Sequence, residues 1–203
     1  WVKNLRTVAE LEPEHISAYS LIVEEGTPFA ARKLNLPDED TEYNMYEATA
    51  QILKEYGFEQ YEISNYARKG RECRHNVGYW TRQAYLGFGL GASSLYGKER
   101  FANTADMKKY LENSKNPEKI REKEPSLTRE DEMAEFMFLG LRMTKGISKA
   151  DFQRCFGCTI ESVYGEVLEK YESMELLLEK DGRIFLSREG IHVSNSIMAE
   201  FLL

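Results

Sequence analysis

The sequence predicts an α/β region with parallel strands, followed by a winged-helix-like α+β domain. The first prediction comes from a strand, a helix and a second strand with short connections between Ile16 and Tyr66, an order typical of parallel sheets. The second comes from three helical patterns, a hairpin and a closing helix after Ser126. A charged, proline-punctuated stretch separates the two patterns and predicts a linker. We therefore expect a first domain, a linker and a second domain at residues 1–112, 113–125 and 126–203.

The first predicted domain opens with a helix and the strand–helix–strand unit. Apolar residues at helical spacing predict a helix over residues 2–11, and a β-rich run predicts a strand over residues 16–23. An apolar stripe with acidic N-cap candidates predicts a helix over residues 38–56, before Gly57. Alternating residues 58–66 predict the second strand.

The rest of this domain is less regular. Residues 67–80 are polar and predict a loop, whereas the glycine-dense residues 85–95 predict a strand that another group approaches closely. A short helix is expected over residues 107–111.

The second predicted domain carries clear local signals. Thr128, Ser148 and Thr159 each precede a helical pattern as N-cap candidates. Asp181-Gly182 between two apolar runs is a two-residue hairpin signal, and Ser187 opens the last helix. Together these elements favour a winged-helix-like module.

The composition excludes disordered and membrane-embedded chains. Of 203 residues, 42% are hydrophobic and 30% charged, and no apolar run approaches the roughly 18 residues of a membrane span. The three cysteines, an odd number, predict reduced thiols and a cytoplasmic location. No signal-peptide pattern opens the chain. Residues 1–5 resemble the middle of a helix, with no N-cap residue before them, so we expect this chain to be part of a longer protein.

The winged-helix-like pattern raises the hypothesis of DNA binding, and the charge argues against it. The whole chain has a formal net charge of -7. From Ser126 onward, nine Lys and Arg stand against fourteen Asp and Glu, a net of -5. Because phosphate contacts dominate affinity for DNA, an acidic module would repel it. We predict no nucleic-acid partner and interpret the module as a packing or partner domain.

A concentration of chemically active side chains lies within the predicted loop. Eight residues carry a thiol, an imidazole, an amide, a phenol and an indole, contributed by Cys73, His75, Asn76, Tyr79 and Trp80. The imidazole can ligate a metal and the rings can stack on a flat conjugated ligand. The alternative, favoured by residue types alone, is that the rings pin the loop to the core.

Two further segments are candidates for cofactor contact. Glu62 and Ser64 share one face of the second predicted strand by its period of two, and the alternative is a solvated edge strand. The run Gly87–Ala92 exposes backbone that a nucleoside can approach, and close strand packing is equally consistent with it. Its spacing is not that of the dinucleotide fingerprint.

The pair Cys155 and Cys158 has C-x-x-C spacing but stands alone. A zinc or iron–sulfur site needs three or four ligands, and Cys73 is remote in sequence. We predict two small buried thiols and no metal site in this chain.

Five segments, taken together and in this order, resemble the radical-SAM haem chaperones of the HemW type, a family also described as oxygen-independent coproporphyrinogen III oxidases. They are residues 13–19, 24–28, 61–67, 73–80 and 87–92. The His-Asn-x-x-Tyr-Trp element at residues 75–80 is the most specific of them, and the chain's ending resembles the family's C-terminal domain. The similarity spans essentially the whole chain.

The resemblance implies that residues 1–112 are the C-terminal portion of a radical-SAM α/β barrel. The parent protein would hold a [4Fe–4S] cluster and S-adenosylmethionine, with the cluster's C-x-x-x-C-x-x-C motif upstream of this chain. The chain itself would then bind no cluster and be inactive as an enzyme. It also implies cofactor contacts from Glu62, Ser64, Asn65, Gly89, Gly91 and Ala92. Ser93 departs from the family pattern, in which His is common there.

By the same resemblance, His75 is the haem iron ligand, supported by Asn76, Tyr79 and Trp80. We expect part of a haem chaperone that hands haem to acceptor proteins. The alternatives are part of a coproporphyrinogen III dehydrogenase, which performs oxidative decarboxylation, and a cofactor-free interaction domain. An exposed sheet edge where further barrel strands belong would favour self-association.

Overall fold

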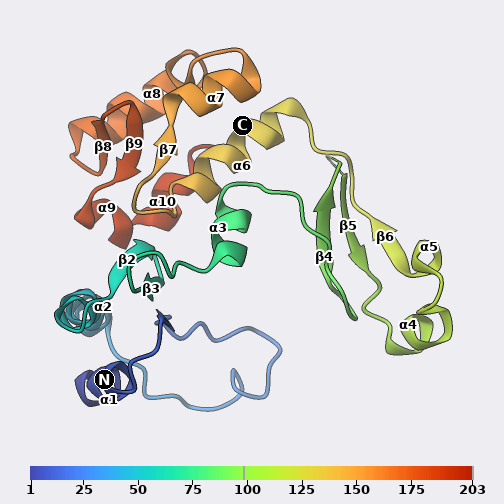
Figure 1. The fold of residues 1–203 in the computed structure, drawn as a ribbon, viewed down its shortest axis with the longest axis horizontal. Coiled ribbons are helices and arrows are strands. Elements are labelled where there is room, and N and C mark those ends of the chain that lie inside the picture. The colour runs from blue at the N-terminus through green and yellow to red at the C-terminus, as the bar shows by residue number, and fades with distance from the viewer. Residues whose placement is uncertain (98, 203) are drawn as a thin grey trace. The chain divides into compact units, whose positions relative to one another are not determined.

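The computed structural model describes residues 1–97 and 99–202 (Figure 1). The chain forms two compact units, of which the first comprises Trp1–Arg74 with Met143–Lys145 and the second His75–Arg142 with Gly146–Leu203. No helix among the described residues combines the length and the apolar character needed to cross a bilayer.

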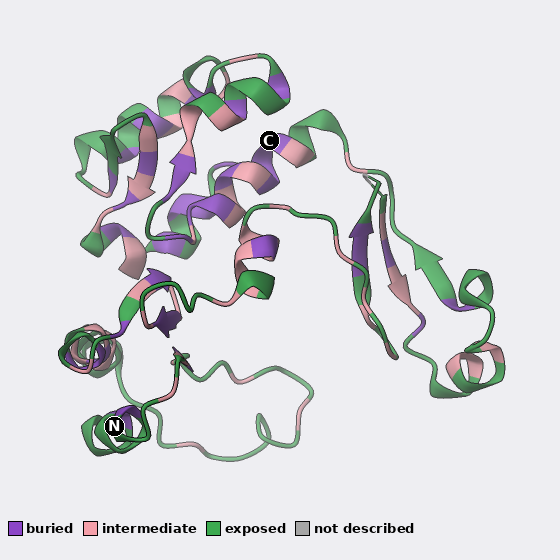
Figure 2. Ribbon diagram, in the orientation of Figure 1, coloured by how far each residue is buried: buried purple, intermediate pink, exposed green. Residues whose placement is uncertain are grey.

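The first unit is a small three-stranded sheet with two helices. Its elements are α1 (Val2–Glu10), β1 (His15–Ser17), α2 (Glu39–Glu55), β2 (Glu59–Glu62) and β3 (Asn65–Ala67). The strand order is β1-β3-β2. Its buried core consists of Leu5, Ala9, Ile16, Ile52, Leu53, Phe58 and Tyr66. The segment between β1 and α2 is exposed along most of its length (Figure 2).

The predicted parallel strands are not found among the described residues, where every strand pair is antiparallel. The run over residues 58–66 is a hairpin, because the chain turns after Glu62 and β3 pairs back onto β2. The turn is stabilised by the Glu62 carboxylate, which accepts a hydrogen bond from the Ser64 amide at 2.8 Å. The first strand also ends early, at Ser17 rather than at residue 23. Alternation alone does not distinguish one strand from a tight hairpin.

The predicted helix limits of this unit are confirmed within a residue or two. Asp38 is the N-cap of α2 and accepts from the Thr41 amide at 2.9 Å. Gly57 follows the helix with φ +82°, the left-handed conformation that favours glycine after a C-cap.

The second unit begins with an irregular region and a three-stranded antiparallel sheet. Its elements are α3 (Arg74–Trp80), β4 (Ser93–Tyr96), β5 (Glu99–Asn103), α4 (Met107–Asn113), α5 (Pro117–Ile120) and β6 (Arg121–Lys123), with strand order β4-β5-β6. One local prediction is wrong here, because the expected loop over residues 67–80 contains α3. The segment 113–125, expected as a linker, contains α5 and β6, which pairs with β5.

The glycine-dense residues 85–95 also differ from the predicted continuous strand. Only the bridge between Tyr85 and Leu95 and the start of β4 are extended and paired. Gly89 and Gly91 have φ of +112° and +66°, which interrupts a strand. The overall division into residues 1–112 and 126–203 stays a prediction.

The remainder of the second unit is an antiparallel sheet, order β7-β9-β8, surrounded by helices. The elements are α6 (Arg129–Gly140), β7 (Ile147–Ser148), α7 (Lys149–Phe156), α8 (Ile160–Ser173), β8 (Leu177–Lys180), β9 (Arg183–Leu186), α9 (Arg188–His192) and α10 (Ser194–Ala199). Five aromatic rings form edge or tilted contacts within it, namely Phe136, Phe152, Phe156, Tyr164 and Phe201.

The local signals of this region are confirmed. Thr128 forms a capping box with Asp131 at the start of α6, and Ser148 and Thr159 cap α7 and α8. The hairpin turns at Asp181-Gly182, both with positive φ, as a two-residue hairpin of this type requires. The last predicted helix is two short helices, α9 and α10.

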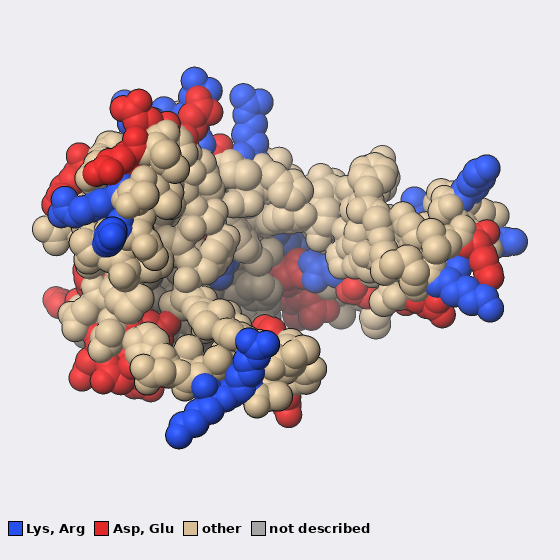
Figure 3. All heavy atoms as spheres, turned by 90° about the horizontal axis from the view of Figure 1, so that it is seen from below, with Lys and Arg blue, Asp and Glu red and all other residues tan. Residues whose placement is uncertain are grey.

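Charged side chains of both signs are interspersed on the face drawn in Figure 3. In the second unit, Lys149 forms ion pairs with Glu161 and, at 2.8 Å, with Glu179. These carboxylates raise the pKa of the Lys149 ammonium, chiefly through the hydrogen bond to Glu161.

Candidate functional site

A row of aromatic rings extends from α3 in the second unit. His75 and Tyr79 are four residues apart, so the helix places them on one face, with ring centroids 4.5 Å apart in edge contact. Tyr79 in turn contacts Tyr85 edge-on at 4.6 Å. His75 is exposed, while both tyrosines are half-buried. The helix, which was not predicted, therefore brings the imidazole and the two phenols together.

Trp80 lies one position further along the same helix and is half-buried. The Arg142 guanidinium stands over its ring at 4.3 Å, a cation–π contact. The indole nitrogen of Trp80 is buried and has no hydrogen-bond partner among the described residues. Asn76, the fourth residue of the predicted haem set, is half-buried on this helix and has a polar contact.

A pocket of about 380 Å³ lies beside these rings. It is lined by Tyr79, Trp80, Arg82, Gln83, Tyr85, Ser93, Leu95, Arg100, Glu124 and Leu139. Two of the four predicted haem residues, Tyr79 and Trp80, thus line the pocket, while His75 lies outside the lining and contacts the ring of Tyr79. Partial burial raises the pKa of the Tyr85 hydroxyl, which keeps this phenol neutral at physiological pH.

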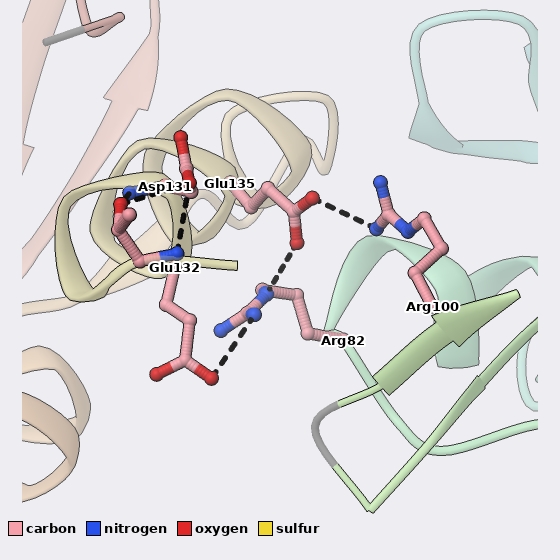
Figure 4. A network of polar contacts seen from close by, with 6 residues as sticks. Arg82, Arg100, Asp131, Glu132 and Glu135 are labelled. Atoms are coloured by element: carbon pink, nitrogen blue, oxygen red, sulfur yellow. Dashed lines mark hydrogen bonds and ion pairs between the residues drawn. The ribbon is translucent and has the colours of Figure 1, made fainter. Parts of the chain in front are cut away.

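Two of the lining residues, Arg82 and Arg100, belong to the ion-pair network drawn in Figure 4. The Glu135 carboxylate accepts from Arg82 Nε at 3.0 Å through one oxygen and pairs with Arg100 Nη2 at 2.8 Å through the other. Arg82 also lies 3.8 Å from Glu132. The Glu135 side chain is only 7% exposed, and a buried charge requires such partners. The network therefore holds both guanidinium groups in fixed positions.

Sequence reasoning missed these three residues. Arg82, Arg100 and Glu135 are far apart in sequence, and the fold brings them together. One signal existed in the sequence: Glu135 interrupts the apolar run from Met133 to Met137. A charge at a core-facing helical position usually has a buried partner.

The predicted cofactor residues of the first unit form a compact hydrogen-bonded cluster. Glu62 and Asn65 are buried, and the Asn65 amide donates to the Glu62 carboxylate. Asn65 also accepts from Ser17 Oγ at 2.5 Å and donates to the Tyr19 hydroxyl at 3.2 Å. Ser64 lies in the turn, so it does not share a strand face with Glu62 as predicted.

The predicted glycine contacts lie in one turn of the second unit. The Gly91 amide donates to the Thr104 carbonyl at 3.1 Å, and the Asn103 side chain donates to the Gly89 carbonyl at 2.8 Å. Ala92 and Ser93 follow, with the Ala92 carbonyl accepting from the Asn103 amide at 2.9 Å. The positive φ of Gly89 and Gly91 accounts for glycine at both positions, although an added Cβ would have open space. Their role toward a cofactor stays a prediction.

The cysteines are all free thiols. Cys155 is exposed, so the prediction of two buried thiols is wrong for it; Cys158 is half-buried, with an Arg129 nitrogen 3.6 Å from its sulfur. No cluster of three or more His, Cys, Asp or Glu with metal-binding geometry occurs within residues 1–97 and 99–202.

Comparison with known proteins finds similarity to HemW and HemN proteins. Residues 127–193 match the family model of the HemN C-terminal domain. The chain is 34% identical over 203 residues to the heme chaperone HemW of Bacillus subtilis, covering 98% of this chain and 54% of that protein. It is 35% identical over 198 residues to the heme chaperone HemW of Lactococcus lactis, covering 96% and 52%. The chain thus spans about half the length of the curated relatives it matches.

A solved structure shares the fold. It is that of the coproporphyrinogen III oxidase HemN from Escherichia coli, described as a radical SAM enzyme, with a TM-score of 0.76. The match covers 98% of this chain and 50% of that one at 18% identity. At this identity the likeness concerns the fold.

Proposed function

We propose that this chain is part of a cytoplasmic radical-SAM haem chaperone, and that its α3 helix binds haem as cargo. The proposal is supported by its 34% and 35% identity to two heme chaperones HemW and by the match of residues 127–193 to the HemN C-terminal domain. The observation that carries the proposal is the exposed His75 beside the ring row of Tyr79 and Tyr85.

These residues fit a haem cargo chemically. An imidazole ligates haem iron, and His75 is exposed and able to reach it. Aromatic rings pack on flat conjugated ligands, and Tyr79 and Trp80 offer such surfaces on the same helix. Asn76, next to His75 on this helix, would support the ligand through its amide.

The cysteines of this chain do not fit an iron–sulfur cluster. The three thiols are dispersed, and the described residues form no group of metal-ligand geometry. We infer that cluster ligands of the parent protein come from outside this chain. Glu62, Ser64, Asn65, Gly89, Gly91 and Ala92 remain our candidates for contact with S-adenosylmethionine, the co-substrate of radical-SAM proteins, in the complete barrel.

We interpret residues 126–203 as a winged-helix-like domain for packing or partner binding, separated by the 113–125 segment from the barrel portion. Its acidic α8 argues against nucleic acid and is compatible with a protein partner such as a haem acceptor. The outer edge of β1 would permit self-association, which light scattering of the purified chain tests. The opposite outer strand of this sheet, β2, already pairs with Met143 and Thr144.

A spectral titration tests haem binding. The chain is titrated with hemin, and His75→Ala is compared with His192→Ala, a matched loss of a histidine on α9. We expect a shifted Soret band in the unmodified chain and in His192→Ala, and its loss in His75→Ala. An unchanged spectrum in His75→Ala would remove His75 as the ligand. Turnover of coproporphyrinogen III by the full-length protein would assign the oxidase function instead.

A further inference from the structure

The pocket beside α3 contains an unusual combination of buried donors. Trp80 Nε1 and Arg100 Nε are both buried and have no acceptor among the described residues. Buried donors without partners are rare, because losing water without gaining an acceptor is destabilising. Both residues line the same pocket. Two residues of one pocket lining thus each carry a buried nitrogen donor without an acceptor among the described residues.

The two guanidinium groups of the pocket are held firmly from behind. Glu135 accepts a hydrogen bond from Nε of Arg82 and pairs with one terminal nitrogen of Arg100. Each guanidinium has five N–H donors, so further donors remain on both. With Glu132 and Glu124 nearby, two arginines stand against three glutamates, so the formal net charge of this group is -1. Recognition in this pocket would therefore depend on directed donors rather than on net charge. Such fixed donors lose little freedom on binding.

The walls of the pocket suit a flat ligand. Tyr79, Trp80 and Tyr85 supply aromatic surfaces, and Leu95 and Leu139 apolar ones. The Tyr79 ring joins the pocket to the His75 imidazole, 4.5 Å away between centroids. A planar ligand held by His75 would thus have its edge near the pocket donors.

We propose that this pocket binds a carboxylate at the edge of a flat conjugated ligand, with Arg100 and Trp80 Nε1 donating to the carboxylate oxygens. The inference rests on the proposed function, because a tetrapyrrole whose iron is ligated by His75 carries carboxylates on its periphery. Charge-assisted hydrogen bonds of this kind are about twice as strong as neutral ones, so the carboxylate contributes substantially to affinity.

Metal-free porphyrins separate this pocket from iron ligation. Protoporphyrin IX and its dimethyl ester differ in carboxylate charge and contain no iron. Binding of each is measured by quenching of Trp80 fluorescence in a Trp1→Phe background, with both ligands in the same detergent buffer. We expect the free acid to bind about tenfold tighter than the ester. Arg100→Gln should abolish most of that preference, and His192→Ala should keep it.

Because Arg100→Gln also breaks the ion pair with Glu135, a second variant is needed. Glu124→Gln removes an exposed carboxylate from the pocket lining. It should strengthen binding of the free acid about two- to threefold at moderate salt and leave the ester unchanged.

Equal affinity of the unmodified chain for acid and ester, or an equal loss of both in Arg100→Gln with no gain in Glu124→Gln, overturns the carboxylate pocket. A retained acid preference together with an unchanged hemin spectrum in His75→Ala overturns iron ligation and leaves the pocket standing. The two proposals therefore fail separately.

Discussion

Replacing Glu135 by Gln should destabilise the second unit by about 2–3 kcal/mol. The substitution keeps the side-chain volume but removes the charge that both Arg82 and Arg100 contact. Breaking a fully buried ion pair costs about 3–5 kcal/mol, whereas an exposed pair contributes about 0–1 kcal/mol. The carboxylate is 7% exposed, but the guanidinium groups are 15% and 29% exposed, so water screens part of the loss.

Urea unfolding measures this loss. Trp80 fluorescence in a Trp1→Phe background reports on the second unit, because these are the two tryptophans of the chain. Glu130→Gln is the matched control: the same substitution in the first turn of α6, at an exposed position. We expect the control to lose about 0.5 kcal/mol or less. If Glu135→Gln loses no more than the control, the network does not stabilise the unit and our account of the pocket wall is wrong.

Three further predictions concern the same unit. Gly146→Ala should lower the free energy of unfolding by about 2 kcal/mol or more, because Gly146 has φ +61° and an added Cβ would collide with the Ile184 carbonyl. Gly165→Ala should instead raise it by about 0.5–1 kcal/mol in the same urea assay, because Gly165 lies in α8 and an added Cβ there meets open space. Burial raises the pKa of Tyr164 to about 12, so the stability due to its neutral form should be complete below about pH 10 and fall as the pH rises toward 12. Tyr164→Phe should remove that fall and be nearly neutral at pH 7, since the buried hydroxyl has no partner among the described residues; a fall of equal size in the variant contradicts the assignment. Thr128→Ala should cost about 1 kcal/mol through loss of the α6 capping box, and Thr128→Ser should restore most of it; equal thermal midpoints for the two variants would exclude a capping role.

Elements with a local signal were predictable from the sequence. The caps of α2, α6, α7 and α8 and the hairpin turn at Asp181-Gly182 depend on residues within a few positions of one another. The α3 helix was missed for the complementary reason. It contains Asn76 and Gly78, both weak helix formers, and none of Ser, Thr, Asp or Asn directly precedes it.

Strand direction depended on information that the local pattern lacks. The order of strand, helix and strand is typical of parallel sheets, but the second strand here folds back on itself at Ile63-Ser64. The antiparallel partner of β1 is therefore the three-residue strand β3. The alternating pattern predicted β2 and β3 as one continuous strand. The pairing of β6 with β5 likewise joins residues about twenty apart, beyond the range of any turn signal.

The candidate site divides in the same way. Residues 73–80 could be identified because five chemically active side chains lie close together in sequence. Arg82 and Arg100, by contrast, are brought together by the fold. On the proposed function, the site must also release its ligand. A resident haem is usually enclosed, but His75 is exposed on a short helix, and the donors of the adjoining pocket lie beyond the Tyr79 ring. If the cargo is held at two separate points, one through its iron and one through its edge, either contact can open while the other still holds. An acceptor protein that supplies its own iron ligand could then replace His75 before the carboxylate leaves Arg100, and stepwise exchange of this kind needs no large conformational change in the donor.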